Sequence, residues 1–176
     1  MRKRFLHDRY GEGAAFWDEN WDRQWASKLS GPPVVDRRLV SAMRPYLGDN
    51  MLLLEGGCGD GHYLRYFTEL GIRTVGVDFA ARTVTKLNEL LPDADIRVGD
   101  IMSLPFPDDC FDAYYSGGVI EHFEPGVDQA LAEARRVLKS GGYLFVTVPH
   151  LNVSRRLAGL LRNSVCKHDL DGRAGY

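Results

Sequence analysis

The stretch that decides the fold is LLLEGGCGDG, residues 52–61. An apolar run ends in Glu55, four glycines follow among the next six residues, and apolar residues then recur at helical spacing up to Leu70. This order predicts a strand, a tight turn and a helix. Glycine allows positive φ and a close approach of the backbone to a ligand. The turn at the strand's carboxyl end is therefore a candidate cofactor site.

Acidic residues in this turn distinguish between two classes of cofactor. A nicotinamide or flavin dinucleotide binds its pyrophosphate at a G-x-G-x-x-G turn. Here His62 occupies the third glycine position, while Glu55 and Asp60 add negative charge. S-adenosylmethionine has no phosphate and carries a sulfonium and an ammonium group, so acidic residues suit it. The pattern favours S-adenosylmethionine, and a turn that binds no ligand is the alternative.

An acidic residue also ends the second predicted strand, which spans residues 72–77. Asp78 lies where a nucleotide-binding βαβ unit places a carboxylate on the ribose hydroxyls, and Phe79 is suited to cover an adenine face. Two structural alternatives stay open. Asp78 would then only cap the following helix, predicted over residues 80–91, and Phe79 would only belong to the core.

A third predicted strand, residues 95–98, is followed by another acidic residue. Asp100 is unexpected in a dinucleotide fold, but it suits the exocyclic amine of adenine, which needs an acceptor. The adjacent Ile101 amide is placed to donate to the ring. Further strands are predicted over residues 111–116 and 143–148, separated by a helix over about residues 127–138 and a turn over residues 139–142.

Together these segments resemble a class I S-adenosylmethionine-dependent methyltransferase, of the group that includes quinone-biosynthesis and small-molecule methyltransferases. The resemblance covers about the middle hundred residues and rests on the joint order of its motifs. It implies a doubly wound, mainly parallel α/β sheet of Rossmann-like type with strand order 3-2-1-4-5. With the arguments above, it assigns cofactor binding to Glu55, Gly57, Cys58, Gly59, Gly61, Asp78, Phe79, Asp100, Ile101 and Gly118.

The segments on either side of this core complete one expected methyltransferase domain over residues 1–176. Residues 1–50 form a helical cap in which Phe16, Trp17, Trp21 and Trp25 recur at helical spacing. This cap is expected to pack on the sheet or, as the resemblance implies, to form a lid over cofactor and substrate. Residues 51–150 form the cofactor-binding core, and residues 151–176 an incomplete C-terminal part.

The C-terminal part lacks the two further strands with which members of the family continue. An amphipathic stretch, residues 154–161, and a polar stretch, residues 167–176, follow instead. A shortened chain accounts for this most simply. We expect the fifth strand to be an exposed edge, through which the chain self-associates or becomes unstable and weakly active.

Composition restricts the class of protein and its partners. The length of 176 residues fits one domain. The net charge of -2 argues against nucleic acid or a membrane surface as the main partner. No apolar run reaches the length of a membrane span, and the basic start is not followed by a signal-peptide pattern, so a cytoplasmic location is expected. The three cysteines are isolated, and neither a metal site nor a disulfide is predicted.

The chemistry of methyl transfer requires few side chains. The reaction is an in-line displacement from a sulfonium, so alignment supplies much of the catalysis and a base is needed only if the acceptor must lose a proton. His122 and His150 follow predicted strands and are the candidate bases, or else polar wall residues. Glu121 is a candidate for the cofactor ammonium, and His62 for its methionine part.

Three functions follow from these observations. The first is an S-adenosylmethionine-dependent methyltransferase that acts on a small molecule, with the acceptor atom open. The second is a protein that binds the cofactor without catalysis. The third, disfavoured by His62 and Asp100, is a nucleotide-linked oxidoreductase.

Overall fold

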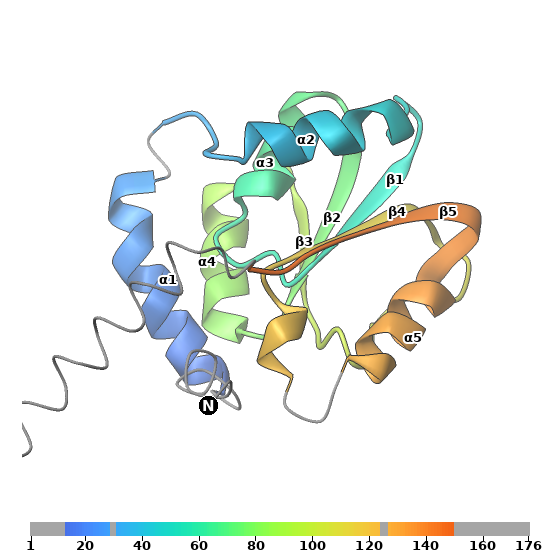
Figure 1. The fold of residues 1–176 in the computed structure, drawn as a ribbon. Helices are drawn as coiled ribbons and strands as arrows, with labels where there is room; N and C mark the ends of the chain where they lie inside the picture. The colour runs from blue at the N-terminus through green and yellow to red at the C-terminus, as the bar shows by residue number, and fades with distance from the viewer. Residues whose placement is uncertain (1–12, 29–30, 124–126, 150–176) are drawn as a thin grey trace, which may run out of the picture. The chain divides into compact units, whose positions relative to one another are not determined.

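The computed structural model describes residues 13–28, 31–123 and 127–149, and within the first range the side chains only up to residue 21. Five strands form one sheet in the order β3-β2-β1-β4-β5, and all neighbouring pairs are parallel (Figure 1). The predicted α/β fold and strand order are confirmed. The strands are β1 (Leu52–Gly56), β2 (Arg73–Asp78), β3 (Asp95–Val98), β4 (Phe111–Gly117) and β5 (Leu138–Thr147).

Helices precede or connect these strands. In the described part they are α1 (Ala14–Lys28), α2 (Arg37–Met43), α3 (His62–Glu69), α4 (Ala81–Leu90) and α5 (Asp128–Val137), together with the short 3-10 helices η2 (Arg44–Tyr46) and η3 (Ile120–His122). The buried residues of α5 are Ala130, Ala134 and Val137, and this spacing of four and three gives the helix one apolar face.

The two faces of the sheet carry different helices, as Figure 1 shows. Successive side chains of a strand point to opposite faces. In β1, Leu54 belongs to a core cluster with Ala134 and Val137 of α5, whereas Leu53 clusters with Met43 of α2 and Phe67 of α3. The central strands are buried on both faces, which explains the continuous apolar run in the sequence.

The start of β5 differs from the sequence prediction. A turn was expected over residues 139–142, but β5 begins at Leu138, directly after α5, and these residues belong to the strand. They form an irregularity in the pairing with β4, because Phe111 pairs with Leu138 while Ala113 pairs with Tyr143. The prediction of a turn between helix and strand is therefore wrong. These residues form a bulge within the strand, where Gly141 has a φ of 79°.

Two sequence predictions concern the end of the chain. Within the described residues β3 and β5 are the edges of the sheet. His150 and residues 151–176 lie outside the described part, so the incomplete C-terminal part and self-association through β5 stay predictions. Each helix of the described part is too short or too polar to span a lipid bilayer.

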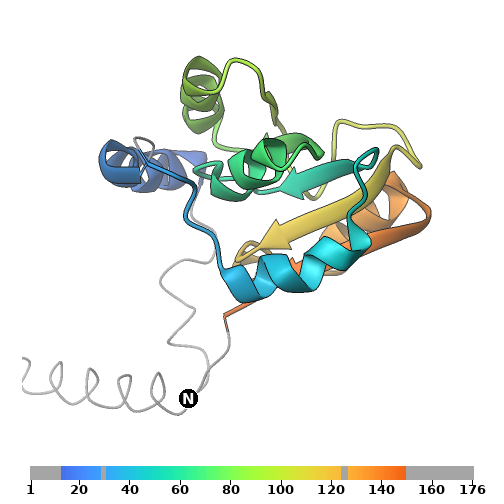
Figure 2. The same cartoon turned by 90° about the horizontal axis from the view of Figure 1, so that it is seen from above.

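Helix α1 lies beside α4 (Figures 1 and 2) and supplies the cap of that helix. The residue at the N-cap position of α4, Ala80, has no side chain that can accept a hydrogen bond. The buried carboxylate of Asp18 accepts hydrogen bonds from the backbone amide and the hydroxyl of Thr83, both at 2.8 Å. These bonds satisfy an amide of the first turn that has no partner within the helix.

Replacing Asp18 by Ala tests this cap. We expect the free energy of unfolding to fall by about 1 to 2 kcal/mol, as for the loss of a helix N-cap. Urea denaturation measures the change. The control is Asp93→Ala, which removes a carboxylate from the exposed turn after α4. Equal stability of the two variants would contradict the role assigned to Asp18.

Candidate functional site

A cavity of about 590 Å³ opens where the central strands end. Its walls come from the glycine turn after β1, the end of β2, the loop after β3, the end of β4 with η3, and α1. This is the edge of the sheet where open α/β folds bind ligands. The lining residues are Trp17, Trp21, Glu55, Gly57, Cys58, Gly59, Asp60, Tyr63, Asp78, Phe79, Gly99, Asp100, Ile101, Tyr115, Gly117, Gly118, Val119, His122 and Phe123.

The glycine turn is fixed to the end of β2 by backbone hydrogen bonds. The amides of Gly57 and Cys58 both donate to the Val77 carbonyl, at 2.7 and 2.9 Å. The Gly59 amide donates to the carboxylate of Asp78 at 2.9 Å. The shape of the turn is therefore set by the neighbouring strand and not by the turn alone.

Two positions in the turn require glycine for two reasons each. Gly57 and Gly59 have φ values of 75° and 49°, which side chains rarely adopt. A Cβ atom would also lie 2.5 Å from the side chain of Val119 in the first case and from that of Trp21 in the second. A methyl group at either position would fill space next to the cavity.

Gly61 differs in position from the other glycines of the predicted cofactor site. It is not among the lining residues, and it stands at the N-cap of α3 with a φ of 72°. A Cβ atom there would approach Leu87 of α4 at 3.2 Å. The requirement for glycine at this position is explained by helix geometry and packing.

Buried carboxylates concentrate negative charge in the cavity. Glu55 is 5% exposed, and its Oε2 has no hydrogen-bond partner among the described residues. Burial raises the pKa of Glu55 well above its usual range, and the charge of Asp60 raises it further. Burial also raises the pKa of Asp78, and hydrogen bonds from the Ala80 and Gly59 amides oppose this effect. Among the residues that the structure describes, no lysine or arginine lines the cavity, so this lining favours a cationic ligand group.

Aromatic side chains also line the cavity. The ring centroid of Trp17 lies 6.0 Å from that of Trp21 and 5.0 Å from that of His122. Tyr63 of α3 and Tyr115 of β4 have ring centroids 5.0 Å apart. Helix α1 thus packs on α4 and also lines the cavity, so the two expectations for the cap do not exclude each other.

The loop after β3 and the end of β4 provide most of the remaining predicted residues. Asp100 accepts a hydrogen bond from the Met102 amide at 2.9 Å, and Ile101 beside it is buried. Phe79 lines the cavity with 42% of its surface exposed. Gly118 lines it too, with a φ of 71°.

The residues predicted to act as a base or to contact the methionine part of the cofactor do not all line the cavity. His122 lines the cavity, with its Nε2 3.9 Å from Oε1 of Glu121. The other carboxylate oxygen of Glu121 is buried and accepts no hydrogen bond from the described residues. His62 is not a lining residue; its Nδ1 accepts a hydrogen bond from the Val34 amide at 3.2 Å. Burial raises the pKa of the Cys58 thiol, so it stays protonated.

Several lining residues were not predicted from the sequence. Tyr114 and Tyr115 are neighbours in β4, but only the second faces the cavity, and the fold decides which of the two it is. The other additions are Tyr63, Gly99, Gly117, Val119 and Phe123. The described residues contain no group of side chains that would hold a metal ion.

Comparison with known proteins gives one family. Residues 54–146, more than half of the chain, match the model of the methyltransferase domain. A probable S-adenosylmethionine-dependent methyltransferase of Mycolicibacterium smegmatis is 36% identical over 100 residues, which cover 56% of this chain and 38% of that protein. A probable tRNA methyltransferase 9B of Bos taurus is 31% identical over 150 residues, which cover 84% and 30%.

A solved structure agrees with the fold. The TehB-like S-adenosylmethionine-dependent methyltransferase of Corynebacterium glutamicum superposes with a TM-score of 0.60 and 25% identity, covering 75% of this chain and 72% of that one. The chain spans only about a third of the length of the two curated relatives, 38% and 30%.

Replacing Glu55 by Gln tests the buried charge. The pKa of Glu55 is higher in the folded chain than in the unfolded chain, so ionisation destabilises the fold as the pH rises above the unfolded value. We expect the Gln variant to be more stable than the parent by roughly 1 to 3 kcal/mol at about pH 8, the usual cost of an unsatisfied buried group, and equally stable at about pH 4.

Urea denaturation of both chains across this pH range, without ligand, measures the difference. A control variant, Glu69→Gln, changes a half-exposed carboxylate on α3. A difference between Glu55→Gln and the parent that did not change with pH would contradict the assignment of a raised pKa to Glu55.

Proposed function

This chain belongs to the methyltransferase domain family, and from that premise we propose that it binds S-adenosylmethionine in the cavity and transfers the methyl group to a small molecule. The observation that carries the proposal is the buried, unpartnered Oε2 of Glu55 beside the glycine turn. A buried carboxylate oxygen without a partner is costly, and a ligand ammonium group would satisfy it.

The other lining residues fit the remaining parts of the cofactor. Asp78 is the proposed acceptor for the ribose hydroxyls, although its carboxylate already accepts from the Gly59 and Ala80 amides, because each oxygen has a second lone pair. Phe79, Asp100 and Ile101 are proposed to surround the adenine. A dinucleotide fits less well, since its pyrophosphate would meet carboxylates and no lining lysine or arginine.

The catalytic contribution of the chain is mainly alignment. When bound, the sulfonium supplies an electrophilic methyl group. Glu55 and Asp78 would fix the ammonium group and the ribose of the donor, while Trp17 and Trp21, which line the cavity, would shield it from water. His122, which lies on the cavity wall, is proposed to accept a proton from acceptors that must lose one.

Aromatic walls and the absence of lining cations support a small, uncharged or cationic acceptor. The relative named as a probable tRNA methyltransferase makes nucleic acid the second candidate. A polyanion would need basic side chains near the cavity mouth, and the net charge of the whole chain is -2. Methylation of tRNA but of no metabolite would overturn the small-molecule proposal.

The first test is calorimetric binding of S-adenosylhomocysteine, with NAD as the competing ligand. We expect binding of the first compound only. Asp78→Asn should weaken it by about 1.5 to 3 kcal/mol, the value of a hydrogen bond to a charged group. Asp95→Asn is the control, because that carboxylate is paired with Arg97 on the exposed edge strand β3.

Equal affinity of the Asp78→Asn and parent chains would contradict the ribose assignment. Binding of NAD in place of S-adenosylhomocysteine would favour the oxidoreductase. Binding of S-adenosylhomocysteine without turnover on any acceptor would favour a cofactor-binding protein that lacks catalysis.

The second test concerns His122. With an acceptor whose reacting group must lose a proton, His122→Gln should lower kcat by about a hundredfold, because proton transfer by a placed side chain contributes at least this much. The Kd of S-adenosylhomocysteine, measured in parallel, should change less than about twofold, since no contact with the cofactor is assigned to this ring. An unchanged kcat would leave His122 as a wall residue only.

A further inference from the structure

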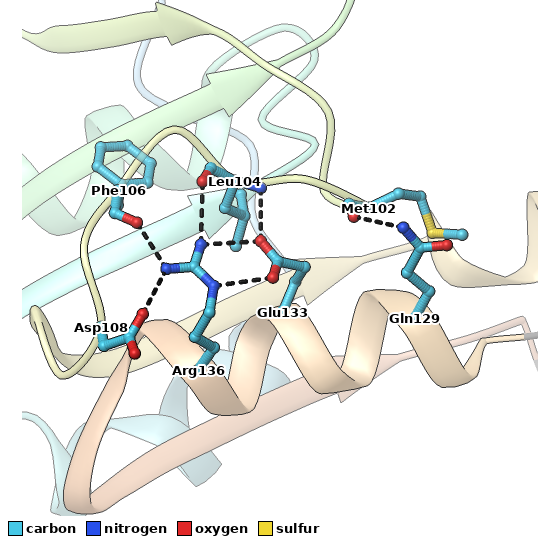
Figure 3. A network of polar contacts seen from close by, with 7 residues as sticks. All are labelled: Met102, Leu104, Phe106, Asp108, Gln129, Glu133 and Arg136. Carbon is cyan, nitrogen blue, oxygen red and sulfur yellow. Dashed lines mark hydrogen bonds and ion pairs between the residues drawn. The ribbon is translucent and has the colours of Figure 1, made fainter.

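One network outside the cavity joins α5 to the loop between β3 and β4 (Figure 3). The Nε of Arg136 donates to Oε1 of Glu133 at 2.8 Å. Its Nη1 donates to the Phe106 carbonyl at 2.7 Å and to the Asp108 carboxylate at 2.9 Å. Its Nη2 donates to the Leu104 carbonyl at 3.0 Å and to Oε2 of Glu133 at 2.8 Å. All five guanidinium donors therefore have acceptors.

The network extends to further residues of the same helix and the same loop. Glu133 Oε2 also accepts from the Leu104 amide at 2.7 Å, and the Gln129 side chain donates to the Met102 carbonyl at 2.8 Å. Residues 129, 133 and 136 are spaced as one face of a helix. Their partners in the loop are residues 102, 104, 106 and 108.

The loop held in this way leads directly into the cavity. Asp100 and Ile101 are lining residues and come just before Met102, the first residue that α5 holds. The Met102 amide donates to the Asp100 carboxylate, so the position of the Met102 backbone also fixes the Asp100 side chain. Arg136 binds the carbonyls of Leu104 and Phe106, and the side chains of these two residues are buried in the core.

We propose that Arg136, together with Glu133, is a positioning residue of the cofactor site. It acts through the loop backbone to hold Asp100 and Ile101 where they meet the adenine end of the ligand. The inference rests on the proposed function for the identity of that ligand. Lysine cannot replace Arg136, because a single ammonium has three donors and lacks the planar fork that reaches four groups at once.

The variants for the test are Arg136→Gln, Arg136→Lys and Glu133→Gln. The matched control is Arg135→Gln, the same change at the neighbouring position of α5, whose side chain is exposed. Each chain is examined by urea denaturation, by calorimetry with S-adenosylhomocysteine and by hydrogen exchange of its backbone amides without ligand. A stability control is Ile72→Val, which alters the core cluster on the other face of the sheet.

We expect the Arg136 variants to bind S-adenosylhomocysteine about tenfold more weakly or worse, as a network of charged hydrogen bonds is lost. Exchange should rise in residues 101–106 and stay unchanged in β1. Arg136→Lys should not restore the affinity. The double variant Glu133→Gln/Arg136→Gln should lose no more than the worse single variant, because the two residues act as a unit. Arg135→Gln and Ile72→Val should bind as the parent chain does.

Several results would overturn the inference. If Arg136→Gln bound the ligand as tightly as the parent, Arg136 would have no positioning role. The inference would also fail if Ile72→Val, at an equal loss of stability, weakened the binding of S-adenosylhomocysteine as much as Arg136→Gln does. It would fail as well if Arg136→Lys bound this ligand as tightly as the parent chain. If the parent itself bound no S-adenosylhomocysteine, the proposed function would fail, and this inference with it. Where an acceptor is known, a raised KM for the donor with unchanged kcat supports positioning.

Discussion

The end of β2 determines the shape of the cavity. The Val77 carbonyl accepts two amides of the glycine turn, and the Asp78 carboxylate accepts a third, from Gly59. A turn with three glycines at positive φ would otherwise be free to adopt many conformations, since glycine loses the most entropy on folding. The hydrogen bonds to β2 remove this freedom. The register between β1 and β2 therefore determines the geometry of the binding site.

Some polar side chains around the cavity have hydrogen-bond partners, whereas two carboxylates each have a buried oxygen without one among the described residues. At the edge, Oδ1 of Asp18 caps α4 by accepting from Thr83, and every guanidinium donor of Arg136 has an acceptor. Inside, Glu55 and Glu121 each keep a buried oxygen without a partner among the described residues. Such groups destabilise a fold and are retained where a ligand satisfies them.

The sequence predicted those parts of the structure that depend on local patterns. Glycine spacing and an acidic residue at the end of each of three strands predicted most lining residues, and the family resemblance that these motifs carry implied the strand order. Contacts between distant elements left no such signal. Nothing local to Asp18 indicates that it caps a helix some sixty residues away, and Arg136 reads only as a charge on the polar face of α5. The bulge in β5 was missed because glycines at 141 and 142 are typical of turns.

The position of the aromatic residues has an optical consequence. All three tryptophans of the chain, Trp17, Trp21 and Trp25, belong to α1, and two of them line the cavity. The indole fluorescence of this protein therefore arises from one helix. Its emission maximum depends on how far water reaches those rings, and the Trp17 ring lies within quenching range of an imidazole, 5.0 Å from His122. The chain carries an intrinsic, label-free reporter in the wall of its own cavity.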